Sequence, residues 1–96
     1  MSNMRARFDS VAGDRRHNFT DIPIFDRLSQ NRRLCGYLKV TSLLKDENEF
    51  DVHGEHDIIY LNDESDLKLL TDDDILYLAR CGIFWDSEND CLAHFC

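Results

Sequence analysis

The segment at residues 71–82, TDDDILYLARCG, carries both a helix start and a helix stop, and it constrains the fold more than any other part of the chain. Thr71 is a preferred N-cap residue, and Asp74 stands three positions later, where its carboxylate can accept the backbone N–H of the cap residue. Gly82 suits the left-handed conformation that closes a helix. These signals predict a helix over about residues 72–81.

A hairpin is predicted directly after this helix. Residues 83–85 and 91–95 are short runs rich in aromatic and aliphatic side chains, and residues 86–90, DSEND, form a polar connection of hairpin length. Alternation along a strand places Phe84 on the opposite face from Trp85. The last quarter of the chain is therefore expected to form a helix followed by two antiparallel strands.

Three earlier segments have the composition of strands. Residues 34–44 contain Tyr, Val and Thr among leucines, residues 49–52 alternate polar and apolar side chains, and residues 57–61 form a largely apolar run. The short turns between them favour an antiparallel meander. The sequence thus predicts an α+β fold, in which an antiparallel sheet of three to five strands carries the 72–81 helix on one face.

A single domain is expected, because 96 residues suffice for one hydrophobic core. Residues 1–19 show no sustained apolar period, so they are expected to form a flexible or loosely docked basic arm, with the α+β domain over residues 20–96. The chain contains neither a signal-peptide pattern nor an apolar run near the roughly 20 residues that span a bilayer. A soluble protein is therefore expected, without membrane contact, in the cytoplasm or, if viral, in the host cell interior.

Charge is distributed unevenly along the chain, whose formal net charge is −8. Residues 1–39 contain eight Lys or Arg and four Asp, whereas residues 40–96 contain three Lys or Arg and fifteen Asp or Glu. Contacts with phosphate need cations, so this balance disfavours direct binding to nucleic acid. It favours a protein partner that presents a basic surface.

Most of the acidic residues fall in predicted turns or at the predicted helix start, where they should be exposed. Carboxylates grouped on one side present charge much as a phosphate backbone does, and they attract the basic groove of a nucleic-acid-processing complex. The expected function is a small non-enzymatic inhibitor or interaction protein that occludes a basic site, similar in size and charge to anti-CRISPR proteins and immunity proteins. The expected contact residues are Asp63, Glu64, Asp66, Asp72, Asp73, Asp74, Asp86, Glu88 and Asp90.

The C-terminal cysteines and histidine support an alternative function. Cys91, His94 and Cys96 form a C-x2-H-x-C run, and these side chains suit a structural zinc ion. The alternative is a zinc-stabilised protein–protein adaptor. A regular strand, however, directs Cys91 away from His94 and Cys96, so the first expectation is that the protein needs no cofactor.

The run LARCGIFWDSENDCLAHFC at residues 78–96 is similar to the middle of a baculoviral IAP repeat, in which a helix leads to an aromatic strand, a polar turn and a Cys-x-x-Cys pair. Cys96 stands at the position of the second cysteine of that pair, and Ala93 stands at the position of the first. The resemblance covers only the last quarter of the chain, and it assigns no zinc ligand to this sequence.

A small hydrolase is the third hypothesis. No nucleophile lies in a recognisable setting such as G-x-S-x-G, and the HGEH run at residues 53–56 is not the H-E-x-x-H of zinc peptidases. An enzyme would need a pocket that places His53, His56 or His94 beside a cysteine or a carboxylate.

Aromatic side chains are concentrated near the C-terminus. Tyr77, Phe84, Trp85 and Phe95 provide more aromatic bulk than one helix on a small sheet requires. Packing in the core is their expected use, and a homodimer interface is the alternative.

Overall fold

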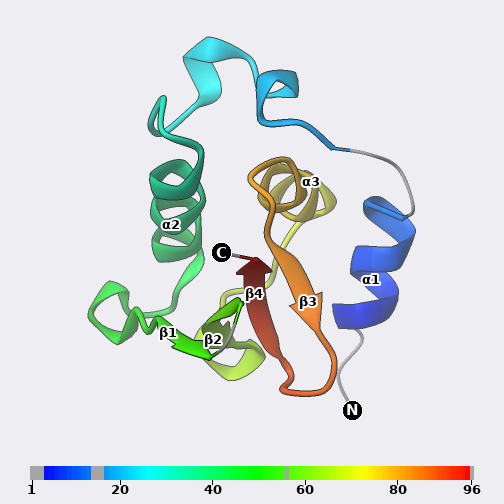
Figure 1. Cartoon of the computed structure of the whole chain (residues 1–96), viewed down its shortest axis with the longest axis vertical. Coiled ribbons are helices and arrows are strands. Elements are labelled where there is room, and N and C mark those ends of the chain that lie inside the picture. The colour runs from blue at the N-terminus through cyan, green and yellow to red at the C-terminus, as the bar shows by residue number, and fades with distance from the viewer. Residues whose placement is uncertain (1–3, 14–16, 56, 96) are drawn as a thin grey trace.

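The computed structural model describes residues 4–13, 17–55 and 57–95 of the chain. In this part of the chain, three α-helices are arranged around a four-stranded sheet (Figure 1). The elements are α1 (Met4–Val11), α2 (Arg32–Leu43), α3 (Asp72–Arg80), β1 (His53–Glu55), β2 (Ile58–Asp63), β3 (Phe84–Asp86) and β4 (Cys91–Phe95). None of the described helices is both long enough and apolar enough to cross a membrane.

The sheet is antiparallel throughout, and its strand order is β1-β2-β4-β3. Ile59 of β2 lies opposite His94 of β4, and Trp85 of β3 lies opposite Leu92 of β4. The last strand of the chain is therefore internal, with the hairpin partner on one side and β2 on the other. The predicted α+β fold with an antiparallel sheet of three to five strands is confirmed.

Helix α3 begins and ends where the sequence predicts. The Thr71 hydroxyl accepts the N–H of Asp74 at 3.1 Å, and the Asp74 carboxylate accepts the N–H of Thr71 at 2.9 Å. Gly82 follows the helix with a φ of 85°, a conformation that glycine adopts without steric cost. Ile75 and Leu78 are fully buried, so core packing stabilises α3 in addition to its caps.

The strand predicted over residues 34–44 is wrong, because this segment forms α2. Asn31 caps the helix by accepting the N–H of Leu34 at 3.0 Å. Gly36 packs so closely on the chain after α3 that a Cβ at this position would lie 2.9 Å from the side chain of Ile83. The cap and this close packing outweigh the β propensity of the tyrosine, valine and threonine side chains.

The two middle strands differ in how well they follow the prediction. The strand expected over residues 57–61 is confirmed as β2, whereas the strand expected over residues 49–52 is absent from the described sheet and β1 begins after it. The buried side chain of Asn62 explains the difference, because it donates to the carbonyl of Glu49 at 2.8 Å and accepts the N–H of Asp51 at 3.0 Å. These backbone groups bond to a side chain in place of a neighbouring strand.

Residues 4–11 of the expected arm form α1, and this helix contributes to the core. Phe8 is 6% exposed and packs against Trp85, with ring centroids 6.3 Å apart. The expectation of a flexible or loosely docked segment over residues 1–19 is therefore wrong for α1. The residues of this segment that lie outside the described part of the chain are 1–3 and 14–16.

Tyr77 of α3 ties down the segment that connects α1 to α2. Its hydroxyl donates to the carbonyl of Asp26 at 2.9 Å and accepts the N–H of Leu28 at 3.1 Å. Burial, and next the contact with Cys35, raises the pKa of Tyr77 to about 12. The hydroxyl therefore keeps its proton at neutral pH, and it can hold both backbone groups.

Candidate functional site

The nine acidic residues expected to contact a partner fall into two groups. Six lie at one end of the sheet, on the end of β2, the 3₁₀ turn that follows it and the β3–β4 turn: Asp63, Glu64, Asp66, Asp86, Glu88 and Asp90. The other three, Asp72, Asp73 and Asp74, form the first turn of α3. Figure 1 shows the β3–β4 turn at the lower end of the molecule and α3 in its upper half.

The register of the sheet brings the first group together. Asp63 of β2 and Asp86 of β3 both lie opposite Cys91 of β4, on its two sides. Burial raises the pKa of the Cys91 thiol, and the negative charges of Asp86, Asp63 and Asp90 raise it further. Because β4 lies between β2 and β3, it joins acidic segments that are distant in the sequence. We call the six residues of this group the acidic end.

Hydrogen bonds orient several carboxylates of the acidic end. Asp86 accepts the N–H of Glu88 at 3.0 Å and the side-chain amide of Asn89 at 2.9 Å, and Asp63 accepts the N–H of Ser65 at 3.0 Å. Short side chains of this kind stabilise the turns in which they lie. No residue of the acidic end forms an ion pair with another described residue, so the negative charge is not neutralised there.

A hollow of about 250 Å³ adjoins the acidic end. The carboxylates of Asp51, Asp63 and Asp66 line it, and no Lys or Arg is among its described lining residues. Asn62, which is 2% exposed, donates to the Asp66 carboxylate at 3.0 Å and holds it at the edge of this hollow. Asp51 lies in an acidic run at residues 46–51, but it was not among the expected contact residues.

The three acidic residues of α3 have a different environment. Asp74 forms an ion pair with Lys39 of α2 at 2.9 Å and closes the Thr71 cap. Partial burial favours the neutral carboxyl, but the Thr71 N–H and Lys39 outweigh it and lower the pKa of Asp74. Asp72 lies 3.3 Å from Arg7 of α1. Two of these three carboxylates thus connect α3 to the other helices, and the structure does not place them at the acidic end.

The residues of the zinc hypothesis do not converge in the described part of the chain. Cys91 and His94 lie three positions apart on β4 and therefore point to opposite faces of the sheet. Nε2 of His94 lies 2.7 Å from the Tyr37 hydroxyl, and Nδ1 lies 2.9 Å from the Phe95 carbonyl oxygen. Cys96 lies outside the described residues. Among those that are described, no three His, Cys, Asp or Glu side chains are grouped to hold a metal ion.

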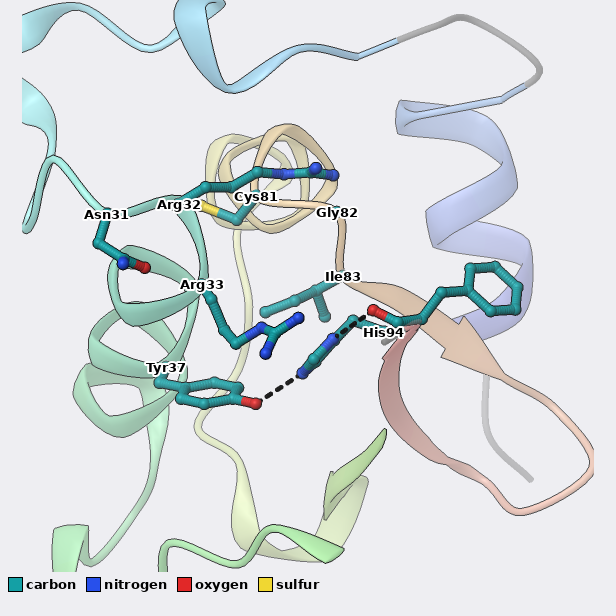
Figure 2. Close-up of a pocket in the computed structure, with 9 residues that line it drawn as sticks. Asn31, Arg32, Arg33, Tyr37, Cys81, Gly82, Ile83 and His94 are labelled. Carbon is teal, nitrogen blue, oxygen red and sulfur yellow. Dashed lines mark hydrogen bonds between the residues drawn. The ribbon is translucent and has the colours of Figure 1, made fainter. Parts of the chain in front are cut away.

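A second candidate site is a pocket of about 430 Å³ between α2, the end of α3 and β4 (Figure 2). Figure 2 shows Arg33 reaching toward Tyr37 and His94, while Arg32 crosses the end of α3 at Gly82. We call it the arginine pocket, and its lining residues are Asn31, Arg32, Arg33, Tyr37, Cys81, Gly82, Ile83, His94 and Phe95. Two adjacent arginines carry no motif, so the sequence alone did not indicate this site.

The tautomer of His94 follows from its partners. A carbonyl oxygen only accepts hydrogen bonds, so Nδ1 carries the hydrogen that is donated to Phe95. In the neutral ring, Nε2 is then the acceptor of the Tyr37 O–H. Both ring nitrogens are satisfied, and the pair forms one wall of the arginine pocket.

The arginine pocket also bears on the hydrolase hypothesis, because it contains His94 and Cys81. No hydrogen bond between these two side chains is present among the described contacts. Burial, followed by the neighbouring Cys35, raises the pKa of Cys81 to about 12, which keeps the thiol protonated and weakly nucleophilic. His53 lines the hollow beside Asp51, and His56 lies outside the described residues. The described part of the chain therefore offers no activated cysteine nucleophile beside His94.

The aromatic residues near the C-terminus are used in different ways. Trp85 is buried, and the hydroxyl of Tyr77 is committed to backbone groups. Phe84 and Phe95 pack together with ring centroids 5.0 Å apart, and Phe95 is 66% exposed. Of the four side chains considered for a homodimer interface, the Phe84–Phe95 pair thus remains at the surface.

Compared with known protein families, curated proteins and solved structures, the chain shows no match. The fold and the two candidate sites are therefore the basis for assigning the class of this protein. It is a small α+β domain with a negative surface at one end of its sheet and a cationic pocket beside the N-terminal end of α2.

Proposed function

We propose that the protein is a non-enzymatic interaction protein whose acidic end docks on a basic surface of a macromolecular partner and occludes it. The observation that supports this proposal is that the six residues of the acidic end lie around β4, on the end of β2, the 3₁₀ turn after it and the β3–β4 turn. None of these residues forms an ion pair with a described residue. The net charge of −8 adds long-range attraction to a cationic partner. The basic groove of a nucleic-acid-processing protein has the required charge.

The proposed contact surface is smaller than the set of nine acidic residues expected from the sequence. Asp74 has an 18% exposed side chain and a lysine partner, and Asp72 lies beside Arg7. A partner could reach these carboxylates only by competing with contacts between the helices. The proposal therefore rests on the acidic end and leaves out the first turn of α3.

Two triple variants that remove the same charge test the proposal. The first changes the β3–β4 turn: Asp86→Asn, Glu88→Gln and Asp90→Asn. Asparagine can still accept the turn hydrogen bond at position 86, and it tolerates the positive φ of 52° at position 90. The control changes acidic residues outside the acidic end: Asp9→Asn, Asp26→Asn and Asp73→Asn. Both variants and the unmodified protein are used as bait in extracts of the source cells.

Proteins captured by the three baits are quantified by mass spectrometry. The proposal predicts a basic protein that the unmodified chain and the control variant retain and the turn variant loses. The affinity of the purified pair should also fall as salt is added, and it should fall less steeply for the turn variant. Retention of the same proteins by both variants, or capture of no basic protein, would contradict the proposal.

A further inference from the structure

The arginine pocket concentrates positive charge in an acidic protein. Arg32 and Arg33 both line it, and no Asp or Glu is among its described lining residues. The ion pairs between described residues use Arg5, Arg7 and Lys39. Neither Arg32 nor Arg33 therefore forms an ion pair with a described carboxylate, and the Arg33 side chain reaches into the pocket toward Tyr37 and His94 (Figure 2).

The rest of the lining supplies a further donor and no acidic side chain. The side-chain oxygen of Asn31 accepts the N–H of Leu34, so its NH₂ group remains available to donate. The Tyr37–His94 pair brings no carboxylate to the pocket, and it adds no repulsion toward an anion. Ile83, which is 3% exposed, contributes a small apolar part of the lining. The lining thus combines cationic and amide donors with a small apolar part and no acidic group.

Gly82 makes room for this arrangement. A Cβ on Gly82 would collide with the Nη2 atom of Arg32, so the guanidinium in this position occupies the space that the glycine leaves open. The positive φ of Gly82 is required by the end of α3 as well. The same residue that ends α3 therefore places one of the two cations at the pocket.

We propose that the arginine pocket binds the phosphate group of a small phosphate ester. A phosphate monoester carries a charge of about −1.5 to −2 at neutral pH, so the cationic lining attracts it more strongly than it attracts a single carboxylate. The planar fork of arginine N–H groups fits phosphate oxygens in a bidentate geometry. The pocket volume of about 430 Å³ exceeds what a phosphate group alone fills, so the organic part of an ester can lie against Ile83 and the rim at Phe95.

This site is separate from the surface of the proposed function. The arginine pocket and the acidic end share no residue, because the pocket is lined from α2, the end of α3 and the last residues of β4. Failure to bind a phosphate ester would therefore not contradict docking on a basic partner, and failure to dock would not contradict phosphate binding.

The test is a titration followed by ¹H–¹⁵N NMR at constant ionic strength. The probes are phenyl phosphate, inorganic phosphate and acetate. Acetate is the comparison, because it is a carboxylate with a single negative charge. The unmodified chain is compared with Asn31→Asp, Arg33→Gln and Lys45→Gln. Aspartate at position 31 can still cap α2, so this variant keeps the helix while it places a negative charge in the pocket. Lys45→Gln removes one positive charge from a side chain that does not line the pocket.

Phenyl phosphate is expected to shift the backbone amides of residues 31–33 and 82–83 in a saturable manner. It should bind more tightly than inorganic phosphate, and acetate should bind more weakly than either. Arg33→Gln and Asn31→Asp are each expected to weaken phosphate binding by roughly tenfold or more, since a charge-assisted hydrogen bond is lost or opposed. Lys45→Gln should bind as the unmodified chain does.

Three results would overturn the inference: no saturable shift with either phosphate probe, an unchanged affinity in Asn31→Asp, or an equal loss in Lys45→Gln. Tighter binding of inorganic phosphate than of phenyl phosphate would overturn the assignment to an ester. If Arg33→Gln fails to give the spectrum of a folded protein, Asn31→Asp decides the outcome because it conserves the cap.

Discussion

The hydroxyl of Tyr37 donates a hydrogen bond of 2.7 Å to Nε2 of His94 and thereby joins α2 to β4. His94 is 7% exposed, and its other ring nitrogen donates to the Phe95 carbonyl. The contact spans 57 positions of the sequence. It holds the helix that carries Arg32 and Arg33 against the sheet, and so it shapes the arginine pocket.

Replacement of Tyr37 by phenylalanine is expected to destabilise the protein by about 1–3 kcal/mol. The change retains the ring and its packing, but it leaves Nε2 of a buried imidazole without a donor. Urea unfolding followed by circular dichroism measures the loss in the free energy of unfolding. A change within the error of the extrapolation would show that the hydrogen bond contributes nothing to the folded state.

Replacement of Thr71 by alanine is expected to cost about 1 kcal/mol, because the N–H of Asp74 loses its acceptor at the start of α3. Thr71→Ser keeps a hydroxyl in the same position and should retain most of the stability. The free energies of unfolding of both variants are compared with that of the unmodified chain. Equal losses in the two variants would mean that the hydroxyl does not act as a cap.

Acid sensitivity is expected to depend on Asp74. Its pKa in the folded protein lies below the ordinary value of 3.8, so the folded state binds fewer protons than the unfolded state in acid. The stability contributed by the Thr71 and Lys39 contacts is therefore complete above pH 3.8 and is lost as the pH falls through the folded pKa. In Asp74→Asn, the free energy of unfolding should start lower and decline less steeply in this range.

The same change one residue earlier provides the control for the pH experiment. The side chain of Asp73 forms no hydrogen bond or ion pair with a described residue, and Asp73→Asn should retain the steep decline. Chemical denaturation at a series of acidic pH values measures both profiles. Parallel profiles for Asp74→Asn and the unmodified chain would contradict the assignment.

Phe8→Ala is expected to lower the free energy of unfolding by about 3 kcal/mol or more, because it opens a cavity beside Trp85. Such a loss is a large fraction of the total stability of a small domain. Arg5→Ala on the exposed side of α1 is the matched control and should have little effect. Thermal unfolding followed by circular dichroism compares the two, and similar midpoints would show that α1 does not belong to the core.

Protein purified without added zinc is expected to contain well below a stoichiometric amount of the metal. The described ligands Cys91 and His94 point to opposite faces of β4, and both nitrogens of His94 have other partners. Inductively coupled plasma mass spectrometry of the purified chain measures its zinc content. Stoichiometric zinc that is lost in both Cys91→Ser and His94→Gln would revive the zinc-stabilised adaptor and count against this prediction.

Elements marked by neighbouring residues were predictable from the sequence. The Thr71–Asp74 cap and Gly82 act within a few positions of one another, and they define α3 whatever packs against it. The polar turn between β3 and β4 is local in the same way, as is the apolar run of β2. For these elements, the information needed to form the structure lies inside the element itself.

Helices α1 and α2 depended on contacts with distant residues. Phe8 reaches a core position by packing against Trp85, and the close approach of Ile83 favours a glycine at position 36 of α2. Over residues 34–44, β-branched and aromatic side chains gave the stronger local signal and favoured a strand. Packing against residues that are distant in the sequence outweighed this local preference for a strand.

The sequence by itself determined the amount of negative charge, the placement of most carboxylates in turns, and the adjacency of Arg32 and Arg33. Only the tertiary structure decided which of these charges meet. The order β2-β4-β3 places Asp63 and Asp86 on either side of Cys91, whereas α3 carries Asp72 and Asp74 to Arg7 and Lys39. The physical reason is that caps and turns act between chain neighbours, while a binding surface needs groups that only strand pairing and helix packing bring into contact.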